Sequence, residues 1–302
     1  MKAMANRKYY AIKGIKAVSL NYKAALSRKL SGGHFEVLEE IGKGRYGTVF
    51  KAKDKASGKI LALKEVTFDT LLKDDCFDLV KTEIEINTRL IHDNIVRMYC
   101  FFNDTTKLTM VMEYISGGDL FTELLKSGGY LSEPEAAFIL SEIVEGLICL
   151  RDRHVIHRDI KPENVLLVRD GNGKVVRAKI CDFTWAVHCL HERRITVCGT
   201  LEYCAPEVAS ATDYDNKADL WSLGVLVYQM LTGELVVKGR NLEEVRKEMR
   251  GLKLEFPNQP TISKEGKDVV KRLLLKTSEE RAGLETIKNH VWVRKNIVKY
   301  KS

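Results

Sequence analysis

The sequence predicts an α+β fold with two lobes, a small antiparallel β-lobe carrying one helix and a larger, mainly α-helical lobe. Its 302 residues are enough for one large domain or for two modest lobes with their own cores. Short stretches of β-type residues dominate up to about residue 114, and helical patterns dominate after about residue 118. Apolar residues make up 45% and charged residues 30% of the chain, a balance that is ordinary for soluble globular proteins.

The first block contains several strand patterns and one helical pattern. Val80, Ile84, Leu90 and Ile91 fall near helical spacing, which predicts a helix between the strands. The expected strands lie around residues 35–38, 48–52, 60–66 and 108–114.

The second block begins its clearest helix after Ser132. Ser132 is followed three residues later by Glu135, which is the pattern of a capping box, and apolar residues at helical spacing come next. The stretch 221–231 is almost wholly apolar and predicts a buried helix that is too short to cross a bilayer. We therefore divide the chain into three parts: a basic extension (1–33), a small lobe (34–114) and a large lobe (115–298).

The net charge of +8 belongs to the extension. Residues 1–35 contain eight Lys and Arg side chains and no acidic one, and the rest of the chain has 41 of each sign. Three interpretations stay open: a disordered tail, a regulatory segment that docks on a partner, and a segment that binds a membrane or nucleic acid. No strong signal supports the third, and salt-sensitive DNA or vesicle binding that is lost on deleting residues 1–33 would favour it.

The seven cysteines form no C-x-x-C pair and no finger spacing. We expect reduced thiols in a cytoplasmic or nuclear protein. The chain has no run of about 18 apolar residues and no compact apolar region near its start, so we expect neither a membrane span nor secretion.

A glycine-rich segment opens the candidate site. Residues 42–49 read G-x-G-x-x-G-x-V, a pattern whose glycines let backbone N–H groups approach phosphate oxygens. A strand follows it, and the pattern alone is weak. Lys64 lies in the next apolar strand, where a lysine either points to water or needs an acidic partner; Glu83 is the candidate partner and Glu85 the fallback.

The most informative segment is 157–164, His-Arg-Asp-Ile-Lys-Pro-Glu-Asn. Asp159 can orient and deprotonate a hydroxyl group, Lys161 can neutralise a phosphate, and Asn164 can hold a metal ion. Asp182, 18 residues after Asn164, adds a second metal ligand. Together these residues are the parts that phosphoryl transfer requires.

These motifs resemble the signature set of the protein kinase family over about residues 35–295. The resemblance implies the two-lobed kinase fold, ATP and Mg²⁺ as cofactors, and protein substrates. It also implies a buried ion pair between Glu207 and Arg281, and anchoring of the catalytic loop by Asp219. Lys161 together with Thr200 resembles the Ser/Thr branch of the family.

Residues 60–64, 185–188 and above all 193–203 resemble the Aurora subfamily. This implies phosphorylation of Ser or Thr in basic contexts, a role in mitosis, activation by phosphorylation of Thr196, and an activating protein that docks on the small lobe. A monomeric kinase domain at the spindle, centrosome or cytoskeleton is expected. A catalytically weak scaffold and a polo-like or AGC-like kinase are the alternatives.

The resemblance also assigns binding residues. The substrate contacts are Glu163 and Thr200, the metal ligands are Asn164 and Asp182, and the catalytic set is Asp159, Lys161, Asn164 and Lys64. The nucleotide contacts are Ile41, Gly42, Gly44, Gly47, Val49, Ala62, Lys64, Glu83, Met112, Glu113, Ile115, Leu166 and Asp182.

Two positions depart from the family pattern. Thr184 replaces the Gly that nearly all kinases have after Asp-Phe, and a β-branched residue is stiffer there. We expect Thr184 to restrict the pose in which Phe183 and Asp182 exchange places, so Thr184→Gly should tighten binding of inhibitors of that pose; unchanged affinity would contradict this. Gln229 is neutral where relatives often have a second acid, which weakens the expected arginine preference.

Overall fold

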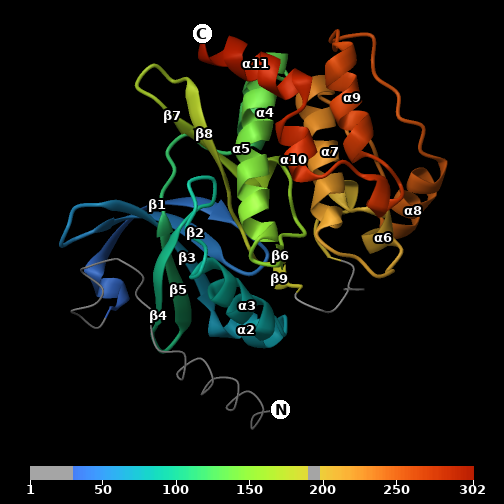
Figure 1. Ribbon diagram of the computed structural model, residues 1–302. Helices are drawn as coiled ribbons and strands as arrows, with labels where there is room; N and C mark the ends of the chain where they lie inside the picture. The colour runs from blue at the N-terminus through green and yellow to red at the C-terminus, as the bar shows by residue number, and fades with distance from the viewer. Residues whose placement is uncertain (1–29, 190–197) are drawn as a thin grey trace. The chain divides into compact units, whose positions relative to one another are not determined.

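The computed structural model describes residues 30–189 and 198–302. The described chain forms two compact units, one of residues 30–92 and 96–114 and the other of residues 93–95 and 115–302. The first unit is built on an antiparallel sheet and the second is mainly helical (Figure 1), which confirms the predicted α+β fold. Residues 1–29 of the basic extension and the predicted phosphorylation site Thr196 lie outside the described residues.

A five-stranded antiparallel sheet in the order β1-β2-β3-β5-β4 forms the first unit. One face packs apolar side chains into a core, where the rings of Phe35 and Phe102 stack at 5.7 Å around the fully buried Ala52, Leu61 and Val111. Strand β4, which the sequence patterns missed, is an edge strand of this sheet. The strands are β1 Phe35–Lys43, β2 Thr48–Asp54, β3 Ile60–Thr67, β4 Met98–Asn103 and β5 Lys107–Glu113.

The helical part of this unit differs in detail from the prediction of one helix. Two helices follow β3: α2 (Phe68–Lys73) and α3 (Phe77–Asn87). Thr67 caps α2 by accepting a hydrogen bond from the Thr70 N–H, and Asp75 adopts a left-handed φ of +46° that separates the helices. A short 3₁₀ turn, η1 (Gly32–His34), precedes β1.

The second unit is built around two long helices, α5 (Glu133–Arg151) and α7 (Lys217–Thr232). Ser132 caps α5 as predicted, because its hydroxyl accepts the Glu135 N–H. Helix α7 contains the predicted core stretch and ends at Gly233, whose φ of +75° is left-handed. The other helices are α4 Leu120–Lys126, α6 Pro206–Ala209, α8 Leu242–Gly251, α9 Lys264–Leu273, α10 Leu284–Lys288 and α11 Val291–Lys301.

Two small strand pairs carry the loops of the candidate site. Hairpin β7–β8 packs against α5 (Figure 1) and holds the segments before and after its strands close together, while β6 pairs with β9. The strands are β6 Val155–Ile156, β7 Val165–Arg169, β8 Val175–Ile180 and β9 Val187–His188; the 3₁₀ turns are η2 Pro162–Asn164, η3 Leu201–Tyr203 and η4 Ser278–Glu280.

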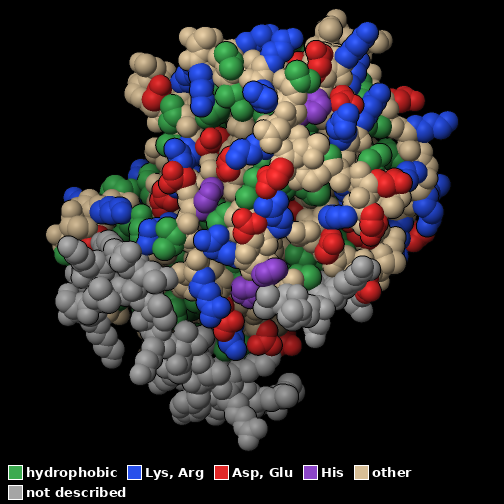
Figure 2. Space-filling view, viewed as in Figure 1, with side chains coloured by type: hydrophobic (Ala, Val, Ile, Leu, Met, Phe, Trp, Pro, Cys, Tyr) green, Lys and Arg blue, Asp and Glu red, His purple; other side chains and the backbone are tan. Residues whose placement is uncertain are grey.

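On the face shown in Figure 2, Lys and Arg side chains are interspersed with Asp and Glu side chains. This agrees with the equal number of acidic and basic residues after the extension. Among the helices of the described residues, none has the length and apolar character needed to cross a membrane.

Candidate active site

The glycine-rich segment forms the end of β1, a turn and the start of β2. The turn is closed by a hydrogen bond from the Gly44 N–H to the Gly47 carbonyl, 2.8 Å long. A Cβ atom at Gly47 would lie 2.5 Å from the Glu65 carbonyl oxygen, whereas Cβ atoms at Gly42 and Gly44 would meet nothing closer than 3.7 Å. Gly47 is therefore required because β3 approaches its backbone closely. At Gly42 and Gly44 a side chain would meet no such close neighbour.

Lys64 and Glu83 form the ion pair that the sequence predicted. The Lys64 Nζ lies 2.7 Å from a Glu83 carboxylate oxygen, and the two side chains are 13% and 1% exposed. Glu85 instead lies on the solvent side of α3, 3.8 Å from Lys81. Helix α3 thus fixes the ammonium group of Lys64 through the buried carboxylate of Glu83.

The side chains of the candidate adenine pocket in the first unit lie on β3 and β5. Ala62 and Met112 are directly paired across these strands, and both are buried. The Glu113 N–H donates to the Arg97 carbonyl at 2.8 Å, so a purine contact through the Glu113 backbone would use its carbonyl group.

In the second unit, three side chains hold the carboxylate of Asp159, which is 5% exposed. Thr200 donates its N–H (3.0 Å) and its hydroxyl (2.8 Å) to Oδ1. Asn164 Nδ2 donates to Oδ2 at 2.9 Å and to the Asp159 carbonyl at 2.8 Å. Lys161 Nζ lies 3.1 Å from Oδ2 and donates to the Thr200 hydroxyl at 2.7 Å. The predicted base, cation and metal ligand are therefore one hydrogen-bonded group.

The backbone of this loop is anchored from α7. The buried carboxylate of Asp219 accepts the N–H groups of His157 (2.8 Å) and Arg158 (2.9 Å), as the kinase resemblance implied. Burial raises the pKa of Asp219, and the two N–H donors oppose this shift. Gly199 lies against the loop with a φ of +81°, and a Cβ atom there would be 2.3 Å from the Arg158 carbonyl oxygen. No other residue fits at position 199 without movement.

Arg158 is half-buried and hydrogen-bonded to neutral groups. Its Nε donates to the Trp185 carbonyl at 2.6 Å and its Nη1 donates to the Tyr214 hydroxyl at 2.9 Å. Among the described residues, no carboxylate forms an ion pair with this guanidinium group. Cys198, two positions after Thr196 in the sequence, is buried, and burial raises the pKa of its thiol, which disfavours the reactive thiolate.

Asn164 and Asp182 offer hard oxygen donors of the kind that Mg²⁺ prefers. Asn164 directs its Nδ2 toward Asp159, so its Oδ1 is the atom suited to a metal ion. Asp182 is half-buried and has a left-handed φ of +58°. Within residues 30–189 and 198–302, no group of three or more His, Cys, Asp or Glu side chains is arranged to hold a metal ion. The donor set thus fits a magnesium ion that takes its other ligands from phosphate and water.

The candidate substrate contact Glu163 lies exposed on η2. Its negative charge affects the pKa of the Tyr203 hydroxyl. The pKa of Tyr203 is raised mainly by burial and further by the charges of Glu163 and Glu202. The Tyr203 hydroxyl donates a hydrogen bond to Gln229 Oε1. Gln229 is therefore held in place by Tyr203 as a neutral group.

The predicted nucleotide contacts are divided between the two units. The first unit carries Ile41, Gly42, Gly44, Gly47, Val49, Ala62, Lys64, Glu83, Met112 and Glu113, and the second carries Ile115, Leu166 and Asp182 with the catalytic loop. The sequence patterns missed Tyr214 as a partner of Arg158 and gave no role to Gly199. Tyr214 had no detectable signal, because it follows Arg158 by 56 residues.

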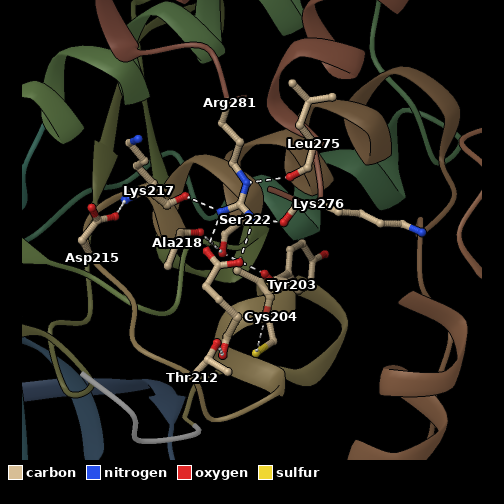
Figure 3. Close-up of polar contacts among 12 residues, drawn as sticks. Tyr203, Cys204, Thr212, Asp215, Lys217, Ala218, Ser222, Leu275, Lys276 and Arg281 are labelled. Carbon is tan, nitrogen blue, oxygen red and sulfur yellow. Dashed lines mark hydrogen bonds and ion pairs between the residues drawn. The ribbon is translucent and has the colours of Figure 1, made fainter. Parts of the chain in front are cut away.

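A buried ion pair joins two segments of the second unit that lie 74 positions apart in the sequence. Arg281 is 4% exposed and makes two parallel hydrogen bonds to Glu207, of 2.6 and 2.7 Å. The same guanidinium group donates to the carbonyls of Leu275 and Lys217 (Figure 3) and stacks over the ring of Trp221. The ion pair that the resemblance implied is therefore present.

Comparison with known proteins agrees with this geometry. The protein kinase domain family matches residues 35–293. Serine/threonine-protein kinase Aurora-2 of Arabidopsis thaliana is 36% identical over 272 residues, which cover 90% of this chain and 94% of that protein. The chain belongs to the Aurora group of protein serine/threonine kinases. Aurora kinase A-B of Xenopus laevis is 38% identical over 87% of this chain and 62% of its own length, and the Aurora kinase of Schizosaccharomyces pombe is 36% identical over 91% and 74%.

Membership of the Aurora group agrees with the resemblance carried by residues 60–64, 185–188 and 193–203. Protein kinases use ATP, typically with Mg²⁺, and act on protein substrates.

Proposed function

We propose that this Aurora-group kinase transfers the γ-phosphoryl group of ATP to Ser or Thr hydroxyls in basic sequence contexts. The arrangement around Asp159 is the observation that carries the proposal. Its carboxylate is oriented by three side chains, and a threonine hydroxyl already donates to it, as an acceptor hydroxyl of a substrate would. Asp159 accepts the proton of the substrate hydroxyl, and Lys161 stabilises negative charge on the transferred group.

Each unit carries some of the proposed nucleotide contacts. The glycine segment with Ile41, Gly42, Gly44, Gly47 and Val49 covers the phosphates, Lys64 contacts them and is oriented by Glu83. The adenine contacts are Ala62, Met112, Glu113, Ile115 and Leu166. Asn164 and Asp182 hold magnesium, which when bound neutralises phosphate charge.

One exposed acidic side chain, Glu163, supports a moderate preference for substrates with basic residues near the acceptor. Glu163 is exposed and able to pair with an arginine upstream of the acceptor, while Gln229 is fixed by Tyr203 and adds no charge. Thr200 contacts both Asp159 and Lys161, so it borders the acceptor hydroxyl.

The proposal extends to a role in the cell cycle, and membership of the Aurora group supports it. We extend to this chain a function in mitosis, activation through Thr196, and a location in the cytoplasm or nucleus that includes spindle and centrosome. An activating protein that docks on the first unit is part of this proposal. Labelling of the full-length protein in dividing cells tests the location, and absence of the label from the spindle and centrosome contradicts it.

The decisive experiment is a phosphotransfer assay with the full chain and Mg-ATP. Three peptides are compared: an arginine-rich peptide with Ser as acceptor, the same peptide with Tyr in place of Ser, and a neutral peptide with Ser. We expect transfer to be fastest on the first, slower on the neutral peptide and negligible on the Tyr peptide. Asp159→Asn should lower the rate about 100- to 10,000-fold, the usual contribution of a general base.

The matched control is Asp152→Asn, which alters an exposed carboxylate that pairs with neighbouring Arg151. Its activity should equal that of the unaltered chain. A chain that binds ATP but transfers no phosphate to any peptide is a nucleotide-binding scaffold, and that result rejects the proposal. Equal rates on the arginine-rich and neutral peptides reject the basic preference alone.

A further inference from the structure

The segment that carries the metal-binding carboxylate is fixed on both sides. Phe183 is fully buried and its ring contacts that of His157 edge to face, with centroids 4.9 Å apart. The His157 Nε2 lies 3.0 Å from the Cys181 carbonyl oxygen. Between these contacts Asp182 has its left-handed φ of +58°, a conformation that Asp adopts more readily than most residues.

Thr184 adds two hydrogen bonds to one oxygen of this carboxylate. Its hydroxyl donates to Asp182 Oδ1 at 2.6 Å, and its backbone N–H donates to the same atom at 3.4 Å. The Thr184 side chain is buried, with 6% of the residue exposed, so its hydroxyl is shielded from competing water. A glycine here would keep the N–H donor and lose the hydroxyl donor.

We propose that Thr184 is a positioning residue, whose hydroxyl fixes the orientation of the Asp182 carboxylate for the metal ion that accompanies ATP. This rests on the proposed function, because it assumes that Asp182 is a metal ligand. Hydrogen bonds from outer groups commonly orient metal-binding carboxylates, and their loss typically costs about 10- to 100-fold in metal affinity or activity. The stiffness of a β-branched side chain is a separate property, carried by the methyl group.

Substitutions at position 184 separate these two properties. Thr184→Val keeps the branched shape and removes the hydroxyl. Thr184→Ser keeps the hydroxyl and removes the branch. Thr184→Gly removes both and keeps the backbone donor.

The measurement is binding of a non-hydrolysable ATP analogue to the full-length protein during a titration with Mg²⁺. A second titration follows bound Mn²⁺ by its paramagnetic signal. The Mg²⁺ concentration at half-saturation should rise about tenfold or more for Val and Gly. Thr184→Ser should stay close to the unaltered chain. Nucleotide binding in the presence of EDTA should be equal for all four proteins, which shows that the fold is kept.

Several outcomes overturn the proposal. Thr184→Val with unaltered metal dependence shows that the hydroxyl has no role, and weakening by Ser but not by Val shows that the branched shape carries the effect. Thr184→Val could misfold, which would show as a loss of nucleotide binding in the presence of EDTA. In that case Thr184→Ser, which keeps the hydroxyl, is compared with Thr184→Gly, which lacks it, and equal metal dependence of these two variants overturns the proposal. A chain that shows the expected metal effects without phosphotransfer rejects the proposed function and leaves the role of Thr184 standing.

Discussion

At the scale of single residues, Arg158 is a cation without a described anionic partner. Its guanidinium group donates to one carbonyl and one phenol hydroxyl, and its neighbour Asp159 is occupied by Thr200, Lys161 and Asn164. A phosphate group placed near Arg158 would give its guanidinium group a charged acceptor, so that both partners of the hydrogen bond carry charge. This gives a physical reason for the proposed activation through Thr196.

Thr196→Ala should therefore lower kcat/KM for the arginine-rich peptide about tenfold or more, since each charge-assisted hydrogen bond contributes about 1.5–3 kcal/mol. The rates are compared after preincubation with ATP, and mass spectrometry reports phosphate at position 196. Ser210→Ala, which changes an exposed residue at the end of α6, is the control. Full activity of Thr196→Ala, or of a chain without phosphate at Thr196, contradicts the activation proposal.

At the scale of elements, α3 has one buried and one exposed glutamate on opposite sides. Glu83 pairs with Lys64 of β3, and Glu85 pairs at longer distance with Lys81 of its own helix. The first pair ties the helix to the sheet, whereas the second contributes little because both of its side chains are about half exposed.

Glu83→Ala should loosen the contact between α3 and β3. Removing one member of a buried ion pair typically costs about 3–5 kcal/mol, because the other charge stays buried. Hydrogen–deuterium exchange of the α3 and β3 amides should accelerate strongly. Glu85→Ala changes the same helix and is the control. It should lower the free energy of opening that exchange reports by no more than about 0.5 kcal/mol. Similar exchange in both variants would show that Lys64 is held by other groups.

The elements that the sequence predicted are those with long or well-bounded patterns. The Ser132 cap, the apolar stretch in α7 and the strands of the glycine segment carry strong local signals. Strand β4 was missed because Met98–Asn103 is a short apolar run, and periodicity alone does not distinguish such a run from a buried helical segment. Helix α2 was missed because six residues are too few for a periodic pattern.

The candidate site divides in the same way. Asp159, Lys161 and Asn164 lie within six positions of one another, so their association follows from local sequence. The contacts of Thr200 with Asp159 and of Tyr214 with Arg158 join residues 41 and 56 positions apart, and they depend on tertiary packing. The left-handed backbone at Asp182 has no sequence signal either, because Asp is most often found with negative φ.

At the scale of the whole molecule, the ion pair of Arg281 with Glu207 connects the last helices of the chain to the segment around α6. Arg281 also binds carbonyl oxygens of two further segments, so one guanidinium group holds four parts of the second unit. Because Trp221 lies under this group, its fluorescence reports on the same region.

Arg281→Met should lower the free energy of unfolding of the second unit by about 3–5 kcal/mol, since it leaves Glu207 unpaired in a nearly buried site. Urea unfolding followed by tryptophan fluorescence measures the change. Arg272→Met removes an exposed i,i+4 pair with Asp268 and should change the same free energy by no more than about 0.5 kcal/mol. Equal stability of both variants would mean that the Glu207 carboxylate finds water when Arg281 is lost.

The hydroxyl of Thr200 is the same chemical group as the acceptor of a Ser/Thr substrate, and it donates to the same carboxylate. The rotational freedom of the Asp159 side chain is therefore given up when the chain folds and not when a substrate arrives. An incoming hydroxyl meets a carboxylate that is already aligned and dehydrated, and it needs to supply little ordering of its own. Weakly bound, disordered protein segments are substrates that such a site is able to use.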